Sequence, residues 1–227
     1  MTRSLRYLPM SQEPRTTWQY NNLMFAVLSH AIETLTGRWL GDVLKDWIWA
    51  PLGMSSTYFD LGQAQAAPEH FARGYYWDNN TEQYLEMPYM PLEEISGAGS
   101  VLSTVNDYAK WLRCLIHQTK PLSKTGIDAI KTPKILTSED AEPYDTPLAY
   151  ASGWFTGSYK GHRFWTHSGG MHAYGAEVYF FPDEKYGIAT FGNTATTSNA
   201  AEQVLAWHLI DEKLGIPKQQ RFDWVGR

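Results

Sequence analysis

HRFWTHSGGMHAYGAEVYFFPDEKYGIATFGN, residues 162–193, is the stretch that decides the fold class of this 227-residue chain. It contains three runs rich in aromatic and β-branched residues, HRFWTH, GAEVYFF and GIATFGN, which predict three β-strands. A fourth run of this kind, YASGWFTGSY at residues 150–159, precedes them. Because only short turns of Gly, Pro, Asp and Lys separate the runs, neighbouring strands are expected to pair antiparallel.

Outside this meander, the sequence predicts helices and one hairpin. From Asn22 onward, apolar residues recur every three or four positions and Gly37 supplies a stop, which is typical of an amphipathic helix. Pro51 is expected to end a second helix, and Ser103 or Thr104 to cap a later one. The predicted elements are helices at about 22–36, 39–50, 104–116, 124–131 and 198–214, and an aromatic-rich hairpin within 70–90.

Helices first, strands afterwards and a closing helix make an α+β arrangement. We predict a single domain over residues 1–227, with a mainly helical part at 1–147 and an antiparallel sheet with a C-terminal helix at 148–227. The last helix is expected to cover one face of the sheet. A cleft is expected where the two parts meet.

Composition narrows the possible partners. The net charge of -5 argues against nucleic-acid or anionic-membrane binding, since both depend on clustered Lys and Arg. Cys114 is the only cysteine, so neither an intrachain disulfide nor a thiolate metal cluster is expected. The start of the chain lacks the apolar stretch of a signal peptide, which favours a cytoplasmic location. A small, nearly neutral molecule is the expected partner, with no cofactor.

Two short motifs contain candidate functional residues. Tyr20, Asn21 and Asn22 stand directly before the first predicted helix, and THSGG, residues 166–170, ends a predicted strand. A purely structural interpretation is available for each motif. Asn22 is a suitable helix cap beside a packed Tyr20, and Gly-Gly is a suitable turn.

Taken together, several motifs support a family resemblance. Tyr-x-Asn, PLGM, SGAGSVLSTVNDYAKWL, His-x-Gly-Gly and EVYFFPDEKYGIATFGN follow one another over nearly the whole chain. In this order they resemble the serine β-lactamase and penicillin-binding-protein superfamily, in particular its class C-like branch with esterases and D-amino-acid peptidases. The resemblance implies a β-lactamase/transpeptidase-like α+β fold, with an antiparallel sheet flanked by helices and a helical subdomain.

The resemblance also implies roles for individual residues. Tyr20 matches the general base and Asn22 the asparagine that binds the acyl or amide group of the substrate. His167, Ser168 and Gly169 match the strand motif that is Lys-Thr-Gly in many β-lactamases. Gly170, the next residue, is expected to offer a backbone N–H to the oxyanion. A histidine in place of lysine removes a permanent positive charge, which favours esters or uncharged acyl groups.

Two other patterns are expected to have no catalytic role. Lys124, Thr125 and Gly126 spell Lys-Thr-Gly, but no strand leads into them and a helical pattern follows. Three histidines, His162, His167 and His172, recur every five residues. In a strand, an odd offset places neighbours on opposite faces, so no metal site is predicted.

The nucleophile motif of the superfamily is absent. No serine or threonine in the chain is followed three residues later by lysine, and only 19 residues precede Tyr20. The resemblance therefore implies a truncated member that lacks its N-terminal Ser-x-x-Lys portion. The expected function is that of a serine acyl hydrolase or transesterase acting through an acyl-serine on a small ester or amide, inactive as this chain alone. The alternatives are a non-catalytic binding protein that retains the pocket and a fragment without function.

Overall fold

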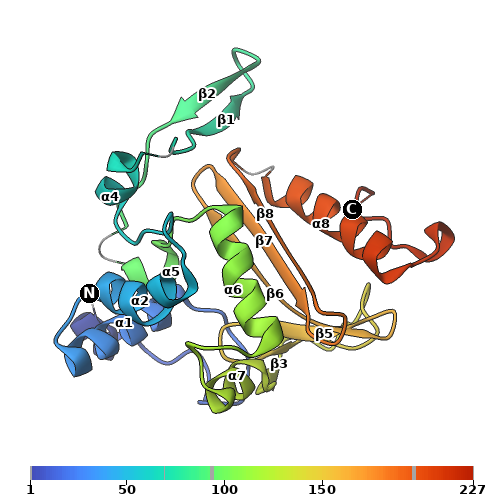
Figure 1. Cartoon of the computed structure of the whole chain (residues 1–227), viewed down its shortest axis with the longest axis horizontal. Helices are drawn as coiled ribbons and strands as arrows, with labels where there is room; N and C mark the ends of the chain where they lie inside the picture. Colours follow the sequence, from blue (N-terminus) through green and yellow to red (C-terminus); the bar gives the residue numbers. More distant parts are fainter. Residues whose placement is uncertain (1, 69, 93–94, 196–197, 227) are drawn as a thin grey trace.

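The computed structural model describes residues 2–68, 70–92, 95–195 and 198–226 (Figure 1). Its helices are α1 (Asn22–Thr36), α2 (Leu40–Leu44), α3 (Ala50–Leu52), α4 (Leu61–Ala66), α5 (Ser96–Gly99), α6 (Val105–His117), α7 (Lys124–Lys131) and α8 (Ser198–Leu214), with a π-helical turn η2 (Lys45–Trp49) and 3-10 turns η1 (Thr2–Tyr7) and η4 (Lys218–Gln220). Its strands are β1 (Gly74–Asp78), β2 (Gln83–Met87), β3 (Ile135–Leu136), β4 (Ala149–Tyr150), β5 (Phe155–Tyr159), β6 (His162–Met171), β7 (Tyr174–Phe181) and β8 (Tyr186–Gly192). None of the helices within the described ranges is long and apolar enough to cross a membrane.

Strands β3 to β8 form one six-stranded sheet in sequence order, and every neighbouring pair is antiparallel. The predicted meander of β6, β7 and β8 is thus confirmed. The fourth predicted run differs, because its first residue, Tyr150, ends β4 and only its second half, Phe155–Tyr159, forms β5. A tight turn separates them: Gly153 adopts φ +86°, and the Ala151 N–H bonds to the Trp154 carbonyl at 2.7 Å.

The sheet is covered by a helix on each face (Figure 1). On one face, Phe164 and Tyr179 pack against Trp207 of α8. On the other face, the next residues along the strands, Trp165 and Phe180, pack with the apolar side of α6. Alternate strand residues point to opposite faces, so both faces of β6 and β7 bury large apolar side chains. The expected α+β fold, an antiparallel sheet flanked by helices, is confirmed.

Asn21, and not Asn22, caps helix α1. The Asn21 side-chain oxygen accepts a hydrogen bond from the Leu23 N–H at 2.8 Å, while its backbone is extended. Asn22 is therefore the first helical residue and not the cap, which corrects the structural interpretation of this position. Gly37, with φ +66°, ends the helix as predicted.

The apolar stripe that predicted α1 is largely exposed. Met24, Leu28 and Leu35 all face solvent, whereas the helix buries Ala26 and Ser29. This buried side lies against α5, where the two backbones approach closely. The stripe correctly indicated a helix, but only part of it is buried: Ile32 packs against the cluster of Leu40, Trp49, Met54 and Phe59, while small side chains face α5.

The second predicted helix is interrupted by a wide turn. After α2, the backbone passes through the π-helical turn Lys45–Trp49, in which the Ala50 N–H bonds to the Lys45 carbonyl. Pro51 was expected to end this helix, but it lies in the first turn of α3, and Gly53 with φ +69° ends the helical path.

The remaining predicted elements form as expected. Thr104 caps α6 by accepting the Asp107 N–H at 3.2 Å. Strands β1 and β2 pair as an antiparallel hairpin that extends away from the sheet (Figure 1). At its base, the Tyr75 N–H bonds to the Asn193 carbonyl at 2.9 Å, which ties the hairpin to the end of β8.

Candidate active site

Tyr20 and His167 lie side by side, although they are far apart in the sequence. Their ring centroids are 5.7 Å apart. Tyr150 of β4 completes the group, because its hydroxyl lies 3.3 Å from the His167 Nε2 and its ring centroid lies 6.4 Å from that of Tyr20. We call these three side chains the tyrosine–histidine cluster. It joins the segment before α1 to β4 and β6.

Aromatic packing positions Tyr20. Two residues earlier, the Trp18 ring packs against Tyr150 and Phe155, with centroids 5.7 and 5.4 Å away. On the other side, the Tyr20 ring lies 6.0 Å from that of Phe25 in α1. The segment before α1 is therefore held between the helix and the strands β4 and β5.

The hydrogen bonds of His167 define its tautomer. Its Nδ1 lies 2.6 Å from the Ser168 carbonyl oxygen, which can only accept, so Nδ1 carries the hydrogen. Nε2 is then free to accept the Tyr150 hydroxyl hydrogen. Burial lowers the pKa of His167, because a charged imidazolium loses hydration there. His167 is thus a neutral imidazole near pH 7.

Tyr20 retains its phenolic proton. Burial raises the pKa of Tyr20 above its ordinary value, even though 43% of the residue is exposed. No cation in the described part of the chain offsets this burial, and the neutral His167 does not supply one. In this chain Tyr20 is therefore a hydrogen-bond donor, and a base role requires a positive group from elsewhere.

The end of β6 presents exposed backbone. Ser168, Gly169 and Gly170 are all solvent-accessible, and Ser168 pairs with Glu177 across to β7. By the alternation of the strand, the Ser168 side chain lies on the opposite face from His167. On that face Asn199 of α8 donates to the Gly169 carbonyl at 3.0 Å and to Glu177 Oε1 at 3.2 Å.

Asn22 is exposed at the start of α1. Because Asn21 provides the cap, the Asn22 amide forms no hydrogen bond to any other residue in the described ranges. Its donor and acceptor groups remain available to a ligand.

Lys124 lies apart from the cluster. It begins α7, with 79% of its side chain exposed, and pairs with Asp128 at 2.8 Å. Ser123 caps this helix through the Gly126 N–H. The literal Lys-Thr-Gly sequence is thus a helix start and not a strand motif, as predicted.

The three regularly spaced histidines have separate surroundings. His162 Nδ1 contacts Glu184 Oε1 at 2.5 Å, His167 belongs to the tyrosine–histidine cluster, and His172 lies in the turn after β6. Across the described ranges, no three His, Cys, Asp or Glu side chains gather in a way that suits a metal ion.

Sequence reasoning missed the neighbours of the motif residues. Trp18, Tyr150 and Asn199 belong to no recognisable motif, and their contacts depend on how the sheet and helices pack. Trp18 lies two residues before Tyr20, but an isolated tryptophan does not indicate its partner. The pairing of β4 with β5, and of β5 with β6, is what brings Tyr150 to His167.

The sequence profile of the Beta-lactamase family matches residues 1–212. The chain belongs to the Beta-lactamase family. The resemblance to the serine β-lactamase and penicillin-binding-protein superfamily of hydrolases is therefore confirmed.

One relative of this chain is the "Unguisins hydrolase ungD'" of Aspergillus campestris. The two sequences are 42% identical over a region that covers 99% of this chain and 42% of the relative. An octameric penicillin-binding protein homologue from Pyrococcus abyssi has a similar fold, with a TM-score of 0.76 at 23% identity over 88% of this chain and 44% of that one. A D-stereospecific amidohydrolase from Streptomyces sp. gives 0.70 at 20% identity, over 91% and 60% of the two chains. The chain thus spans less than half the length of the unguisins hydrolase.

Proposed function

We propose that this chain forms the tyrosine and strand walls of a serine acyl hydrolase active site, and that a separate segment supplies the Ser-x-x-Lys nucleophile. The observation that supports this most directly is the approach of Tyr20 to His167, at 5.7 Å between ring centroids, in a chain of this family. The absence of Ser-x-x-Lys from the sequence supports the second half of the proposal. By itself the chain is then inactive.

In the completed enzyme, the serine oxygen adds to the carbonyl carbon of an ester or amide as its proton passes to the Tyr20 phenolate. Collapse of the tetrahedral intermediate breaks the bond to the leaving alcohol or amine, which takes a proton from Tyr20. Water then adds to the acyl-serine and releases the acid. The positive charge of the lysine in the added segment lowers the pKa of Tyr20, so that Tyr20 is present as the phenolate that accepts the serine proton.

Neutral acyl compounds are the expected substrates. The His167 imidazole is uncharged near pH 7, so it offers hydrogen bonds but little attraction to a substrate carboxylate. The Asn22 amide, which has no hydrogen-bond partner among the described residues, is proposed to bind the acyl or amide group, and the backbone N–H of the exposed Gly170 is proposed for the oxyanion. Because of the 42% identity to the unguisins hydrolase, unguisins are the first amides to test.

The experiment joins the N-terminal part of the Aspergillus campestris relative to this chain. The purified chain alone should give no burst of p-nitrophenol from p-nitrophenyl acetate, whereas the fusion should give a burst followed by turnover. Tyr20→Phe in the fusion should lower kcat about 100- to 10,000-fold, which is the usual contribution of a general acid–base group. Tyr84→Phe, in the exposed hairpin, is the matched control and should leave kcat unchanged.

Turnover by the chain alone that Tyr20→Phe abolishes would mean that the nucleophile lies within these residues. A non-catalytic binding protein is the second candidate, and the neutral state of the tyrosine–histidine cluster supports it. That function would be favoured if the folded fusion bound unguisins without hydrolysing them.

A further inference from the structure

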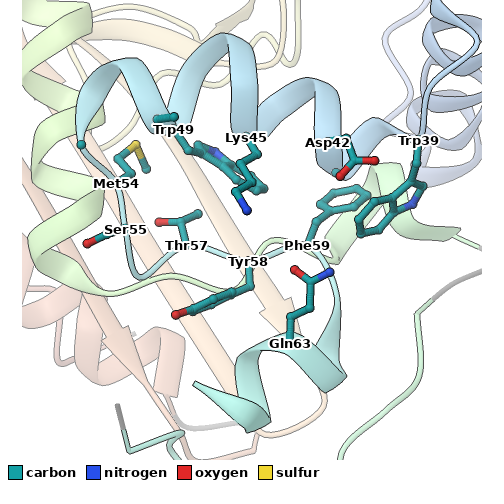
Figure 2. Close-up of a pocket in the computed structure, with 13 residues that line it drawn as sticks. Trp39, Asp42, Lys45, Trp49, Met54, Ser55, Thr57, Tyr58, Phe59 and Gln63 are labelled. Atoms are coloured by element: carbon teal, nitrogen blue, oxygen red, sulfur yellow. The ribbon is translucent and has the colours of Figure 1, made fainter. Parts of the chain in front are cut away.

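A hollow lies in the helical part of the molecule, away from the tyrosine–histidine cluster (Figure 2). Its walls come from Trp39 and the α2–η2 helical path, from the segment after α3 and from Gln63 in the first turn of α4. It encloses about 320 Å³. None of its lining residues belongs to the tyrosine–histidine cluster, so the proposed catalytic role does not explain it.

Three aromatic side chains form the apolar wall. Phe59 makes an edge contact with Trp39, at 5.6 Å between centroids, and lies 6.5 Å from Trp49. The Trp39 indole lies over the backbone of Gly41, where a Cβ would be 2.5 Å from a ring carbon. Glycine at position 41 is thus what allows Trp39 to occupy this place.

Two opposite charges and one amide line the same hollow. In Figure 2 the Lys45 amine and the Gln63 amide point toward each other across it, and the Asp42 carboxylate lies beside Phe59 and Trp39. Within the described part of the chain, neither Asp42 nor Lys45 forms an ion pair. The nearby Arg38 pairs instead with Asp46, at 2.5 Å.

The π-helical turn positions two of the residues that line the hollow. It begins at Lys45 and ends at Trp49, and both side chains face the hollow (Figure 2). π-helical turns are rare and occur frequently at functional sites, because they redirect side chains at a cost in helix stability.

We propose that this hollow binds a free α-amino acid with an aromatic side chain. The aromatic ring packs against Trp39, Trp49 and Phe59, where offset and edge contacts between rings are favourable. The ligand carboxylate faces Lys45 and the Gln63 amide, and its ammonium faces Asp42. A volume near the lower limit for ligand pockets suits a single amino acid and not a longer peptide.

The test is a titration of the ¹⁵N-labelled chain with three probes: L-phenylalanine, phenylacetate, which lacks the ammonium, and phenethylamine, which lacks the carboxylate. L-Phenylalanine should give saturable shifts confined to residues 39–63. Lys45→Gln should weaken L-phenylalanine and phenylacetate about fivefold and leave phenethylamine unchanged, because an exposed charge pair contributes modestly. Asp42→Asn should weaken L-phenylalanine and phenethylamine but not phenylacetate.

Lys124→Gln, an exposed lysine on α7, is the control and should change none of the affinities. Gly41→Ala should abolish binding of all three probes by displacing Trp39, with circular dichroism to verify folding. Were that variant unfolded, the two surface substitutions would decide the matter. Equal affinity for the three probes, or no shifts within 39–63, would overturn the proposal. No step of the test requires catalysis, so its outcome is independent of the proposed hydrolase function.

Discussion

At the scale of single residues, burial decides the charge of the tyrosine–histidine cluster. A lysine in place of His167 would remain charged near Tyr20 and favour loss of the phenolic proton. The imidazole does not, because burial lowers the pKa of His167, and its two nitrogens already have hydrogen-bond partners in Ser168 and Tyr150. Tyr20 and His167 are therefore neutral neighbours in this chain.

His167 should titrate below its ordinary pKa of about 6.5, because burial disfavours the charged form. At pH 6.5 more than half of His167 should remain neutral, with the hydrogen on Nδ1. Long-range ¹H–¹⁵N correlation spectra recorded from pH 5 to 8 measure both properties, and His167→Gln assigns the signal. A midpoint above 6.5, or a hydrogen on Nε2 in the neutral form, would contradict the tautomer described above.

At the scale of elements, α8 packs on the sheet with a buried carboxylate, that of Glu202, in the interface. Glu202 of α8 is only 6% exposed, and neither of its carboxylate oxygens has a partner among the described residues. Burial and the nearby Glu177 together raise the pKa of Glu202 to about 7. Glu177 has partners, since Asn199 and Tyr179 donate to it. Below about pH 7, Glu202 is thus accommodated chiefly in its protonated form.

This arrangement predicts stability that falls as pH rises. The folded chain keeps the Glu202 proton up to about pH 7, whereas the unfolded chain loses it near 4.5, so the folded state binds more protons between these values. The contribution of Glu202 to the free energy of unfolding should decrease by roughly 1–3 kcal/mol from pH 5 to pH 8. Glu202→Gln should remove most of this decrease in urea unfolding series.

Glu139→Gln, in an exposed loop, is the control and should leave the pH dependence as it is in the parent chain. An identical pH dependence in Glu202→Gln and the parent would show that Glu202 is not the titrating group.

At the scale of the whole molecule, the two edges of the sheet differ. β3 is only two residues long, but β8, YGIATFG, has seven residues and no charge, and α6 and α8 both pack against it. In the described structure only β7 pairs with β8. The Thr190 hydroxyl of β8 donates a hydrogen bond to the Glu202 carbonyl of α8. Leu205 and Leu209 lie on the same side of α8 as Glu202 and are 51% and 41% exposed. A long, uncharged edge strand is a template for pairing with another strand.

The isolated chain should therefore self-associate through the β8 edge, because pairing satisfies the edge backbone and covers Leu205 and Leu209. Sedimentation velocity should show an average mass that rises with concentration. The double substitution Leu205→Lys and Leu209→Lys should shift the chain toward monomer by adding like charges beside the edge. Leu136→Lys, exposed on β3, should have no such effect. A constant monomer mass at all concentrations would contradict self-association through the β8 edge.

Local patterns were sufficient for the boundaries of several helices. Thr104, Gly37 and the run at 198–214 mark their helices correctly, because capping, stop signals and helical periodicity depend on residues close in sequence. The same patterns misjudged Pro51 and the run 150–159. The wide turn before Pro51 and the tight turn at Gly153 require backbone geometry that composition does not specify.

The sequence by itself determined the family and indicated Tyr20, Asn22 and His167 as candidate site residues, because the motifs and their order along the chain can be read without a structure. Only the tertiary structure decided which neighbours and hydrogen bonds those residues have. It brought Tyr150 to His167 through the pairing of β4, β5 and β6. By making Asn21 the cap, it also left the Asn22 amide without a hydrogen-bond partner among the described residues. It also decided charge, because the pKa of a buried group depends on neighbours that are distant in sequence.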